Sequence, residues 1–253
     1  IRDVPVAGVK NLWELVECLK NPEPYLKREI QEEIPSIINT DMGMDFSDIE
    51  GQEGAKRAAE IAVSGFHNLL LIGPPGTGKT MLARRLPTIM PGLGFEEKLE
   101  LTRIYSIAGL LSREHPLIDE RPFRSPHHTS TPQAIAGGGR NPRPGEITLA
   151  HKGVLFLDEM PEFSRASLEL LRQPMEDKVI QIARASGTYN FPADFMLCAA
   201  MNPCPCGNFG HPTLKCTCAP GAVTKYINKI SGPLLDRIDI QVELPPVKIE
   251  DIK

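Results

Sequence analysis

The chain has 253 residues, of which 41% are hydrophobic and 24% charged, and this ordinary globular composition excludes an intrinsically disordered chain. Its 28 Lys and Arg residues and 32 Asp and Glu residues give a net charge of −4. That balance excludes a uniformly basic nucleic-acid-binding surface but leaves room for a local basic channel. The longest apolar runs are strand-sized and fall short of the roughly 18 residues of a membrane-spanning helix, so we expect no membrane span.

Both ends of the sequence have features expected of a piece of a longer polypeptide. The chain begins without an initiator Met or a signal-peptide pattern and ends in the charged stretch 249–253. Apolar residues at helical spacing predict a helix over 12–19, and the charged, proline-interrupted stretch 23–46 predicts a linker. We therefore expect an excised part of a larger protein, and the lack of a signal peptide predicts a cytoplasmic location.

The segment 47–248 alternates between helical and strand-like patterns. In chain order the sequence predicts a helix (53–64), a strand (68–72), a loop (73–80), two helices (80–89 and 96–111), a strand (154–157), a helix (165–176), a hairpin (179–184 with 189–191), a strand (196–200), a loop (203–221) and a helix (223–230). Residues 112–150 are rich in Gly, Pro, His and Arg and permit no assignment. Because the strands are apolar on both faces, they indicate a parallel sheet that helices cover on two sides.

A glycine-rich loop between the first strand of this segment and the next helix matches the pattern G-x-x-x-x-G-K-[ST] at every fixed position. Its residues are Gly73, Pro74, Pro75, Gly76, Thr77, Gly78, Lys79 and Thr80. Glycines let backbone N–H groups curl around a polyphosphate, and the helix amino terminus adds partial positive charge. Lys79 would neutralise the β- and γ-phosphates of ATP, and Thr80 would ligate Mg²⁺. An ordinary glycine-rich turn requires neither of these two side chains.

Polar side chains follow the next two apolar strands. After 154–157, Asp158 can hold the Mg²⁺ shell and Glu159 can polarise an attacking water. Because ligands of parallel sheets bind at the carboxyl ends of strands, both carboxylates should lie beside the glycine-rich loop. The alternative is a solvated Asp-Glu turn. Asn202, after strand 196–200, can orient the same water, although Asn before Pro is also a common end of a strand.

Apolar residues on both sides of Arg237 can anchor this segment, while the Arg237 side chain can project outward from it. In NTPases, an arginine that reaches the nucleotide of a neighbouring subunit accelerates hydrolysis by about 10³–10⁵. The alternative is a local ion pair with Asp236 or Asp239, which the spacing alone favours.

Four of the six cysteines form a tight set, Cys204, Cys206, Cys216 and Cys218, with the spacing C-x-C, nine residues, C-x-C. In a reducing compartment such a cluster favours metal over disulfides, and four thiolates can form a tetrahedral Zn²⁺ site. The C-x-C spacing departs from the usual C-x₂-C, so His211 is an alternative ligand and free thiols are an alternative reading. We expect a structural clip near a subunit interface. Cys18 and Cys198 are expected in the core.

These motifs together resemble the core of an AAA+ ATPase, with Gly73–Thr80 as Walker A, Asp158 and Glu159 as Walker B, Asn202 as sensor 1 and Arg237 as the arginine finger. Other segments make the sequence similar to the magnesium-chelatase-like ComM/YifB family of bacteria, over about residues 5–250. They are Phe123–Thr129, Gly137–Gly139, Asn202–Gly207 and Ser231–Asp239.

The resemblance implies an α/β fold, a three-layer AAA+ P-loop NTPase core over 47–248 with a parallel sheet in strand order 5-1-4-3-2. Residues 1–22 would be the tail of a Lon-like domain, and 249–253 would begin the link to a helical lid domain that this chain lacks. The resemblance also implies a homo-oligomeric hexameric ring that uses ATP and Mg²⁺. Such a ring would act on DNA as a helicase or branch-migration motor in uptake or recombination.

In ring helicases basic residues face a central pore and contact DNA phosphates without reading sequence. By resemblance the candidates here are Arg124, His127, His128, Arg140, Arg143, Lys178 and Arg184. For the two histidines the alternative is a local cap of the loop backbone.

Two other functions stay open: a chelatase subunit that uses ATP to insert Mg²⁺ into a porphyrin, and a nucleotide-binding switch that does not hydrolyse ATP. The cysteine loop and the 123–129 match argue against the first, and Glu159 argues against the second.

Overall fold

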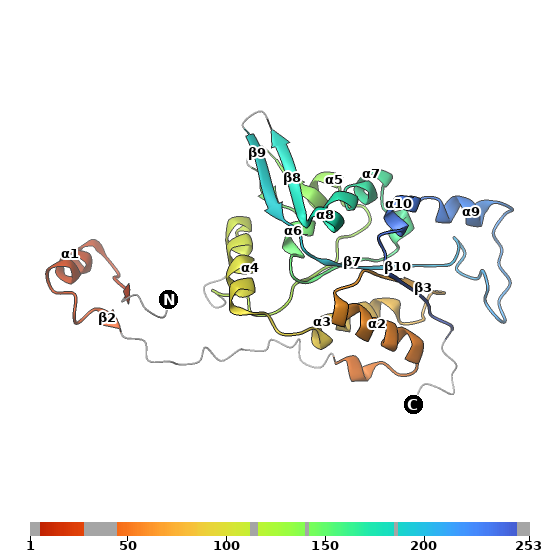
Figure 1. Ribbon diagram of the computed structural model, residues 1–253, viewed down its shortest axis with the longest axis horizontal. Coiled ribbons are helices and arrows are strands. Elements are labelled where there is room, and N and C mark those ends of the chain that lie inside the picture. Colours follow the sequence, from red (N-terminus) through yellow and green to blue (C-terminus); the bar gives the residue numbers. More distant parts are fainter. Residues whose placement is uncertain (1–5, 28–44, 112–115, 140–141, 185–186, 247–253) are drawn as a thin grey trace. The chain divides into compact units, whose positions relative to one another are not determined.

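The computed structural model describes residues 6–27, 45–111, 116–139, 142–184 and 187–246, and Figure 1 traces their helices and strands. The chain divides into two compact units, residues 1–39 and 40–253. None of the described helices is long and apolar enough to span a membrane.

The first unit combines one helix with a short antiparallel strand pair. In it β1 (Val6–Ala7) pairs with β2 (Leu26–Lys27), and α1 (Leu12–Lys20) lies between them in the chain. Asn11 caps α1, because its side-chain oxygen accepts a hydrogen bond from Glu14 N at 2.9 Å. The helix predicted over 12–19 is therefore confirmed. β2 lies inside the stretch 23–46 that was expected to be a linker, of which residues 28–44 fall outside the described part.

The second unit is built on a five-stranded parallel sheet. Its strands are β3 (Leu69–Ile72), β4 (Phe123–Arg124), β7 (Val154–Leu157), β10 (Met196–Met201) and β11 (Ile240–Glu243). They lie side by side in the order β11-β3-β10-β7-β4, with parallel pairing throughout. Numbered along the chain, these strands have the order 5-1-4-3-2, so the expected topology is confirmed.

Helices cover both faces of this sheet, as the apolar strands require, because successive side chains of a strand point to opposite faces. Leu69 and Leu71 of β3 pack in one apolar cluster with α2 (Glu53–Gly65) and α3 (Lys79–Ile89). Leu70 packs in the cluster on the other face. Figure 1 shows α2 and α3 on one side of the sheet and α5, α7, α8 and α10 on the other, which makes a three-layer α/β/α arrangement.

The remaining elements of the second unit connect the sheet strands. They are η1 (Phe46–Asp48), α4 (Phe95–Ala108), α5 (Pro132–Ala136), β5 (Gly137–Gly138), β6 (Arg143–Pro144), α6 (Glu146–Leu149), η2 (Met160–Glu162), α7 (Arg165–Glu169), α8 (Arg172–Asp177), β8 (Val179–Arg184), β9 (Gly187–Pro192), α9 (Ala222–Ile227) and α10 (Gly232–Leu235). The helices predicted over 96–111 and 223–230 each end three residues early. α4 ends at Ala108, because Gly109 follows it with a left-handed φ of 73°. The hairpin predicted over 179–191 is confirmed as β8 and β9, which project away from the sheet in Figure 1.

The single helix predicted over 165–176 is wrong, because the structure breaks it into α7 and α8. Pro174 has no N–H, and in a continuous helix its ring would clash with the carbonyl of Leu170. The backbone turns between the two helices, where Leu171 N bonds to Leu168 O at 3.1 Å in the tighter 3₁₀ pattern. α8 ends at Asp177, and β8 begins two residues later at Val179.

The segment that sequence patterns left unassigned contains β4, α5, the antiparallel pair β5–β6 and α6. Gly137 shows why its glycines are needed, since φ there is 93° and an added Cβ would lie 2.5 Å from Arg143 O. Elements of two to five residues carry too little periodicity for a sequence pattern to reveal them.

Candidate active site

Three adjacent strands of the sheet end at one place and deliver the predicted phosphate-site residues there. β3 leads into Gly73, β7 into Asp158, and β10 into Asn202. Gly73 N donates a hydrogen bond to Met201 O at 3.1 Å, which ties the first loop to the end of β10. The expectation that these side chains meet at the carboxyl edge of the parallel sheet is therefore confirmed by their contacts.

The glycine-rich loop has the backbone of a phosphate cradle. Gly76 and Gly78 have φ of 80° and 84°, a left-handed conformation that side chains disfavour. α3 begins directly after Gly78, and no side chain caps its amino terminus. The N–H groups of its first turn therefore point, with the positive end of the helix dipole, toward the space that the loop encloses.

Lys79 lies at the centre of this loop with only 9% of its surface exposed. Its Nζ donates hydrogen bonds to Gly73 O at 2.7 Å, to Pro74 O at 2.8 Å and to Asn202 Oδ1 at 3.3 Å. Burial lowers the pKa of Lys79, while the carboxylates of Asp158 and Glu159 act in the opposite direction. The ammonium is held in place and can exchange these carbonyl partners for the oxygens of a polyphosphate.

Thr80 and Asp158 place two hard oxygen ligands together beside Lys79. Thr80 Oγ1 donates a hydrogen bond to Asp158 Oδ2 at 2.7 Å, and Asp158 Oδ1 accepts one from Glu159 N at 3.0 Å. A hydroxyl and a carboxylate at the mouth of a phosphate loop fit the preference of Mg²⁺ for one or two protein oxygens plus phosphate oxygens and water. The donor set therefore suits Mg²⁺ bound together with a nucleotide.

Glu159 has a strained backbone and a partner that sequence patterns did not reveal. Its φ is 51°, in the left-handed region, and its side chain is 58% exposed. The carboxylate Oε2 lies 3.6 Å from His128 Nδ1, and the His128 ring packs edge-on against Phe163. The sheet order could have indicated this contact between His128 and Glu159. His128 follows β4 and Glu159 follows β7, and these two strands are neighbours in the sheet.

Two of the basic residues expected to face a pore, Arg124 and His127, make contacts within the chain. Arg124 makes a two-pronged ion pair with Glu146, at 2.7 and 2.8 Å, and these bonds raise the pKa of its guanidinium. This ion pair ties β4 to α6, and the contact of Arg124 with DNA phosphate stays a prediction. His127 Nδ1 accepts a hydrogen bond from Thr129 N at 3.3 Å, so the alternative of a local backbone cap is confirmed for His127.

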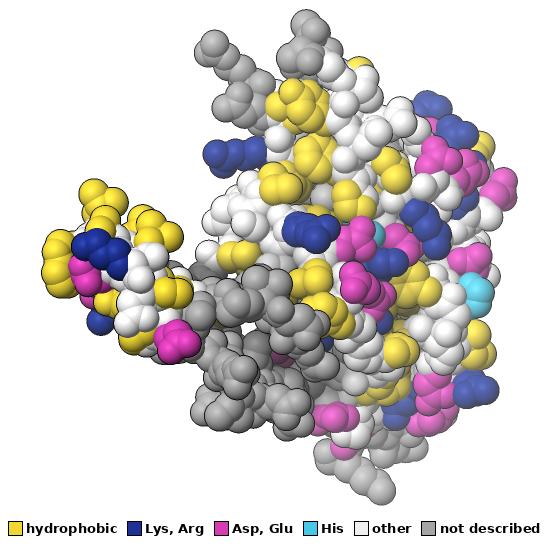
Figure 2. All heavy atoms as spheres, turned by 60° about the vertical axis from the view of Figure 1, so that its left-hand side comes forward, with side chains coloured by type: hydrophobic (Ala, Val, Ile, Leu, Met, Phe, Trp, Pro, Cys, Tyr) yellow, Lys and Arg dark blue, Asp and Glu magenta, His cyan; other side chains and the backbone are white. Residues whose placement is uncertain are grey.

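The remaining pore candidates are less constrained. Arg143 is exposed on β6, and Lys178 is exposed at the base of the hairpin, 3.1 Å from Asp194 Oδ1. Arg140 and the side chain of Arg184 lie outside the described residues. On the described surface in Figure 2, Lys and Arg side chains lie among Asp and Glu side chains without gathering into one basic patch. This mixture agrees with the net charge of −4.

Arg237 lies at the opposite end of β3 from the phosphate loop. Its carbonyl oxygen accepts a hydrogen bond from Asn68 Nδ2 at 2.9 Å, and Asn68 immediately precedes β3. The guanidinium bonds to Glu176 on α8 and to Pro233 O. The alternative of a pair with Asp236 or Asp239 is therefore wrong, because the ionic partner comes from α8, and Asp239 instead accepts from the backbone N–H of Asn68.

The four clustered cysteines lie in the loop between β10 and α9, with all four Sγ atoms within 4.8 Å of one another. The backbone N–H of Asn208 lowers the pKa of the Cys206 thiol to about 5. His211 is not part of the cluster. Its Nδ1 accepts hydrogen bonds from Thr213 N and Leu214 N. Cys18 and Cys198 are buried as expected, and burial raises the pKa of Cys198.

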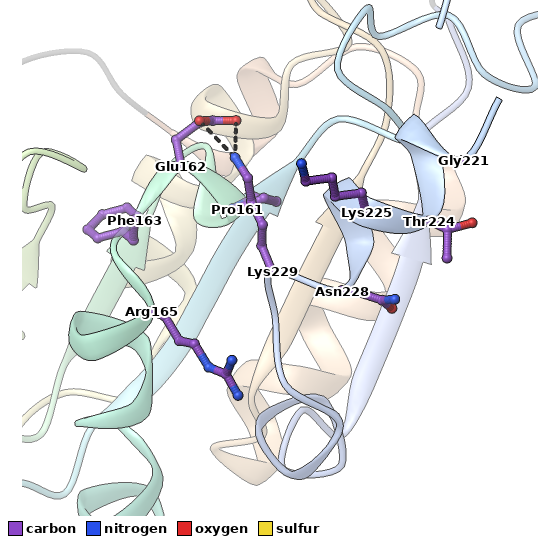
Figure 3. A pocket seen from close by; sticks show the side chains of 9 residues that line it. All are labelled: Pro161, Glu162, Phe163, Arg165, Gly221, Thr224, Lys225, Asn228 and Lys229. Carbon is purple, nitrogen blue, oxygen red and sulfur yellow. Dashed lines mark hydrogen bonds and ion pairs between the residues drawn. The ribbon is translucent and has the colours of Figure 1, made fainter. Parts of the chain in front are cut away.

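A groove of about 830 Å³ lies between η2 and α9 (Figure 3). Arg165, Lys225 and Lys229 line it, and Lys229 Nζ pairs with Glu162 at 3.2 Å. Residues of the glycine-rich loop do not line the groove, so it is distinct from the phosphate site. Tyr226 of α9 is buried, and burial raises its pKa to about 12.

Comparisons with known proteins agree with this geometry. A family model described as magnesium chelatase, subunit ChlI, matches residues 45–252. The chain is 50% identical to the protein YifB of Escherichia coli K12 over 201 residues, which are 79% of this chain and 39% of YifB. It is 44% identical to the competence protein ComM of Haemophilus influenzae over 237 residues, 93% of this chain and 46% of ComM. The chain thus spans less than half the length of these relatives.

Among solved structures, NtrX of Brucella abortus in complex with ADP has a similar fold, with a TM-score of 0.51. It is 18% identical in sequence, and the match covers 82% of this chain and 40% of NtrX. At that identity the likeness concerns the fold alone.

Proposed function

Because the chain belongs to the magnesium chelatase subunit ChlI family, with YifB and ComM among its relatives, we propose that it is the ATP-hydrolysing core of a ring-forming motor. Its fold is the AAA+ P-loop core, with helices on both faces of a five-stranded parallel sheet. The observation that carries the proposal is the hydrogen-bonded convergence of Lys79 with Asn202 and of Thr80 with Asp158.

In the proposed reaction each of these groups has a distinct task. The N–H groups of residues 76–80 and the Lys79 ammonium bind the β- and γ-phosphates of ATP. Thr80 and Asp158 hold Mg²⁺, which when bound neutralises charge on the phosphate oxygens. Glu159 turns from His128 toward the attacking water and polarises it, and Asn202 orients that water from the neighbouring strand.

We propose that Arg237 completes the site of the next subunit rather than its own. Its position at the amino end of β3 separates it from the loop at the carboxyl end of the same strand, which supports an action between subunits. A site completed in this way requires a homo-oligomer, and the AAA+ fold favours a closed hexameric ring.

For the substrate we propose DNA, which the ring would remodel as a helicase or branch-migration factor during DNA uptake or recombination in the cytoplasm. The relative described as a competence protein supports this proposal. So do Arg143 and Lys178, two exposed cations on the small strand pair and at the hairpin. The second candidate is a chelatase subunit that drives Mg²⁺ into a porphyrin, which the family description favours.

ATP turnover by the full-length protein, with and without single-stranded DNA, tests the proposal. We expect magnesium-dependent turnover that DNA stimulates several-fold and that a porphyrin substrate leaves unchanged. Turnover that DNA does not change would refute the DNA motor and leave the ATPase standing. Nucleotide that binds but is never hydrolysed, with or without DNA, would refute the ATPase and favour a nucleotide-binding switch.

A further inference from the structure

The four-cysteine cluster has the dimensions of a tetrahedral thiolate metal site. Cys204 Sγ lies 3.4 Å from Cys206 Sγ and 3.8 Å from Cys216 Sγ, and the latter two sulfurs are 3.6 Å apart. Four sulfurs at about 2.3 Å from a central Zn²⁺ would be about 3.8 Å apart. Disulfide sulfurs lie at about 2.05 Å. The spacing therefore fits one shared ion better than two bonded pairs.

The loop that carries the cluster has few other means of holding its shape. Between β10 and α9 the described chain forms no helix or strand, and the side chains of Phe209 and Leu214 are each 55% exposed. The backbone N–H of Phe209 points at Cys204 Sγ, at 3.3 Å, as hydrogen bonds to metal-bound thiolates do. An ion shared by four sulfurs would close this loop, because metal binding supplies folding free energy locally.

The closed loop packs directly on the phosphate loop. Gly207 has φ of 82°, and a Cβ added there would lie 2.6 Å from Pro75 Cδ, inside the van der Waals contact distance. Gly207 follows the second cysteine, and Cys204 comes two residues after Asn202, whose Oδ1 accepts from Lys79 Nζ. The cysteine loop therefore touches the phosphate site at Pro75 and through the short connection to Asn202.

We propose that Cys204, Cys206, Cys216 and Cys218 bind one Zn²⁺ and that the zinc-bound loop braces Pro75, so that metal occupancy raises the affinity for ATP. The metal site stands on the sulfur geometry alone, whereas the effect on affinity rests on the proposed function. Loss of the ion releases the loop, and the phosphate loop then loses the surface against which Pro75 packs.

Elemental analysis and ATP-binding measurements on the full-length protein, purified under reducing conditions, test both parts. We expect about one zinc per chain. The double variant Cys216→Ser/Cys218→Ser, which leaves Cys204 and Asn202 in place, should lose the zinc and bind ATP about tenfold more weakly. Its melting temperature should stay close to that of the parent, because the large core does not depend on the loop. Cys18→Ala, outside the cluster, should keep the zinc.

Alanine substitutions at two glycines of the same loop distinguish the effect of a disturbed contact with Pro75 from the effect of backbone strain. Gly207→Ala should keep the zinc and weaken ATP binding, because its new Cβ displaces Pro75. Gly210→Ala introduces a Cβ at a similar φ of 76° but meets nothing within 4 Å, so it should leave ATP binding unchanged.

Each contrary result has a definite meaning. Protein without zinc, or with the four thiols oxidised to two disulfides, would refute the metal site. Loss of zinc without any change in ATP affinity would refute the proposed effect of the loop on ATP binding. A parent protein that holds zinc but does not bind ATP would refute the proposed function and the proposed effect of the loop on ATP binding. The proposal of a metal site would stand.

Discussion

Thr80 and Asp158 are hydrogen-bonded at 2.7 Å although 78 residues separate them in the chain. The bond joins the first turn of α3 to the end of β7 and places a hydroxyl and a carboxylate where a nucleotide-bound Mg²⁺ would take its protein ligands. The pair would thus fix the position of the proposed metal before any nucleotide arrives.

The first prediction concerns this metal position. In the parent protein Mg²⁺ should strengthen ATP binding, because the ion links the nucleotide to Thr80 and Asp158. In Asp158→Ala the affinity for ATP without Mg²⁺ should be retained, and the gain on adding Mg²⁺ should shrink toward none. Binding titrations with Mg²⁺ and with a chelator measure both quantities. A variant that keeps the full gain would show that Asp158 does not hold the metal.

The second prediction concerns the phosphate loop. Lys79→Ala should abolish ATP binding or weaken it greatly, because the polyphosphate loses its central positive charge. Lys56→Ala is a suitable control, since Lys56 lies on α2 and pairs with Glu53 at 3.1 Å. If equilibrium binding gave the same ATP affinity for Lys79→Ala as for the control, the assignment of this loop would have to be abandoned.

The third prediction separates binding from chemistry. Glu159→Gln keeps the size of the side chain but removes the carboxylate that polarises water, so this variant should bind ATP and fail to turn over. Glu162→Gln, three residues on and paired with Lys229, serves as the control. Turnover of Glu159→Gln within about threefold of the parent, a barrier change of roughly 0.7 kcal/mol, would mean that another residue activates the water.

Much of this site could be predicted from the sequence because its residues follow strand ends in local patterns. Asp158 and Asn202 each come directly after an apolar strand, and parallel topology brings such positions to one edge. The contacts of His128 with Glu159 and of Gly207 with Pro75 join distant segments through side-chain packing, which no local pattern encodes. Pro174 alone could have predicted the break between α7 and α8, but the helical periodicity on both sides of the break concealed it.

A fourth prediction follows from a buried histidine that the proposed chemistry does not use. His151 is 3% exposed, its Nδ1 accepts from Asp194 N at 3.0 Å, and its Nε2 lies 3.1 Å from Glu100. Burial lowers the pKa of His151, opposed by Glu100 and Asp194 and reinforced by Lys152. Since the unfolded chain then binds the proton more readily than the folded one, stability is lost as the pH falls through about 6.5.

Thermal unfolding between pH 7.5 and 5.5 checks this prediction. The melting temperature of the parent should fall across that interval, and His151→Gln should show a smaller fall because it carries no ionisable group there. His67→Gln, at a half-exposed histidine, should retain the fall of the parent. Identical pH profiles for His151→Gln and the parent would assign the acid sensitivity to other groups.

The last prediction concerns the arginine at the far end of β3. If Arg237 acts on the nucleotide of the next subunit, Arg237→Ala should keep ATP binding nearly intact and lose turnover. Glu176→Gln weakens the ion pair that holds Arg237 within its own chain but leaves the guanidinium in place. A structural role would make the two variants alike, with lower melting temperatures, whereas action between subunits predicts that Glu176→Gln keeps its turnover.

Mixing full-length Arg237→Ala with full-length Glu159→Gln decides between the two roles. Each variant alone is inactive, but a mixed ring contains interfaces where the intact Glu159 of one subunit meets the intact Arg237 of its neighbour. Turnover should therefore reappear on mixing and pass through a maximum as the ratio of the two proteins is varied. Arg237 acting only within its own chain predicts no activity at any ratio, because no subunit then carries both groups.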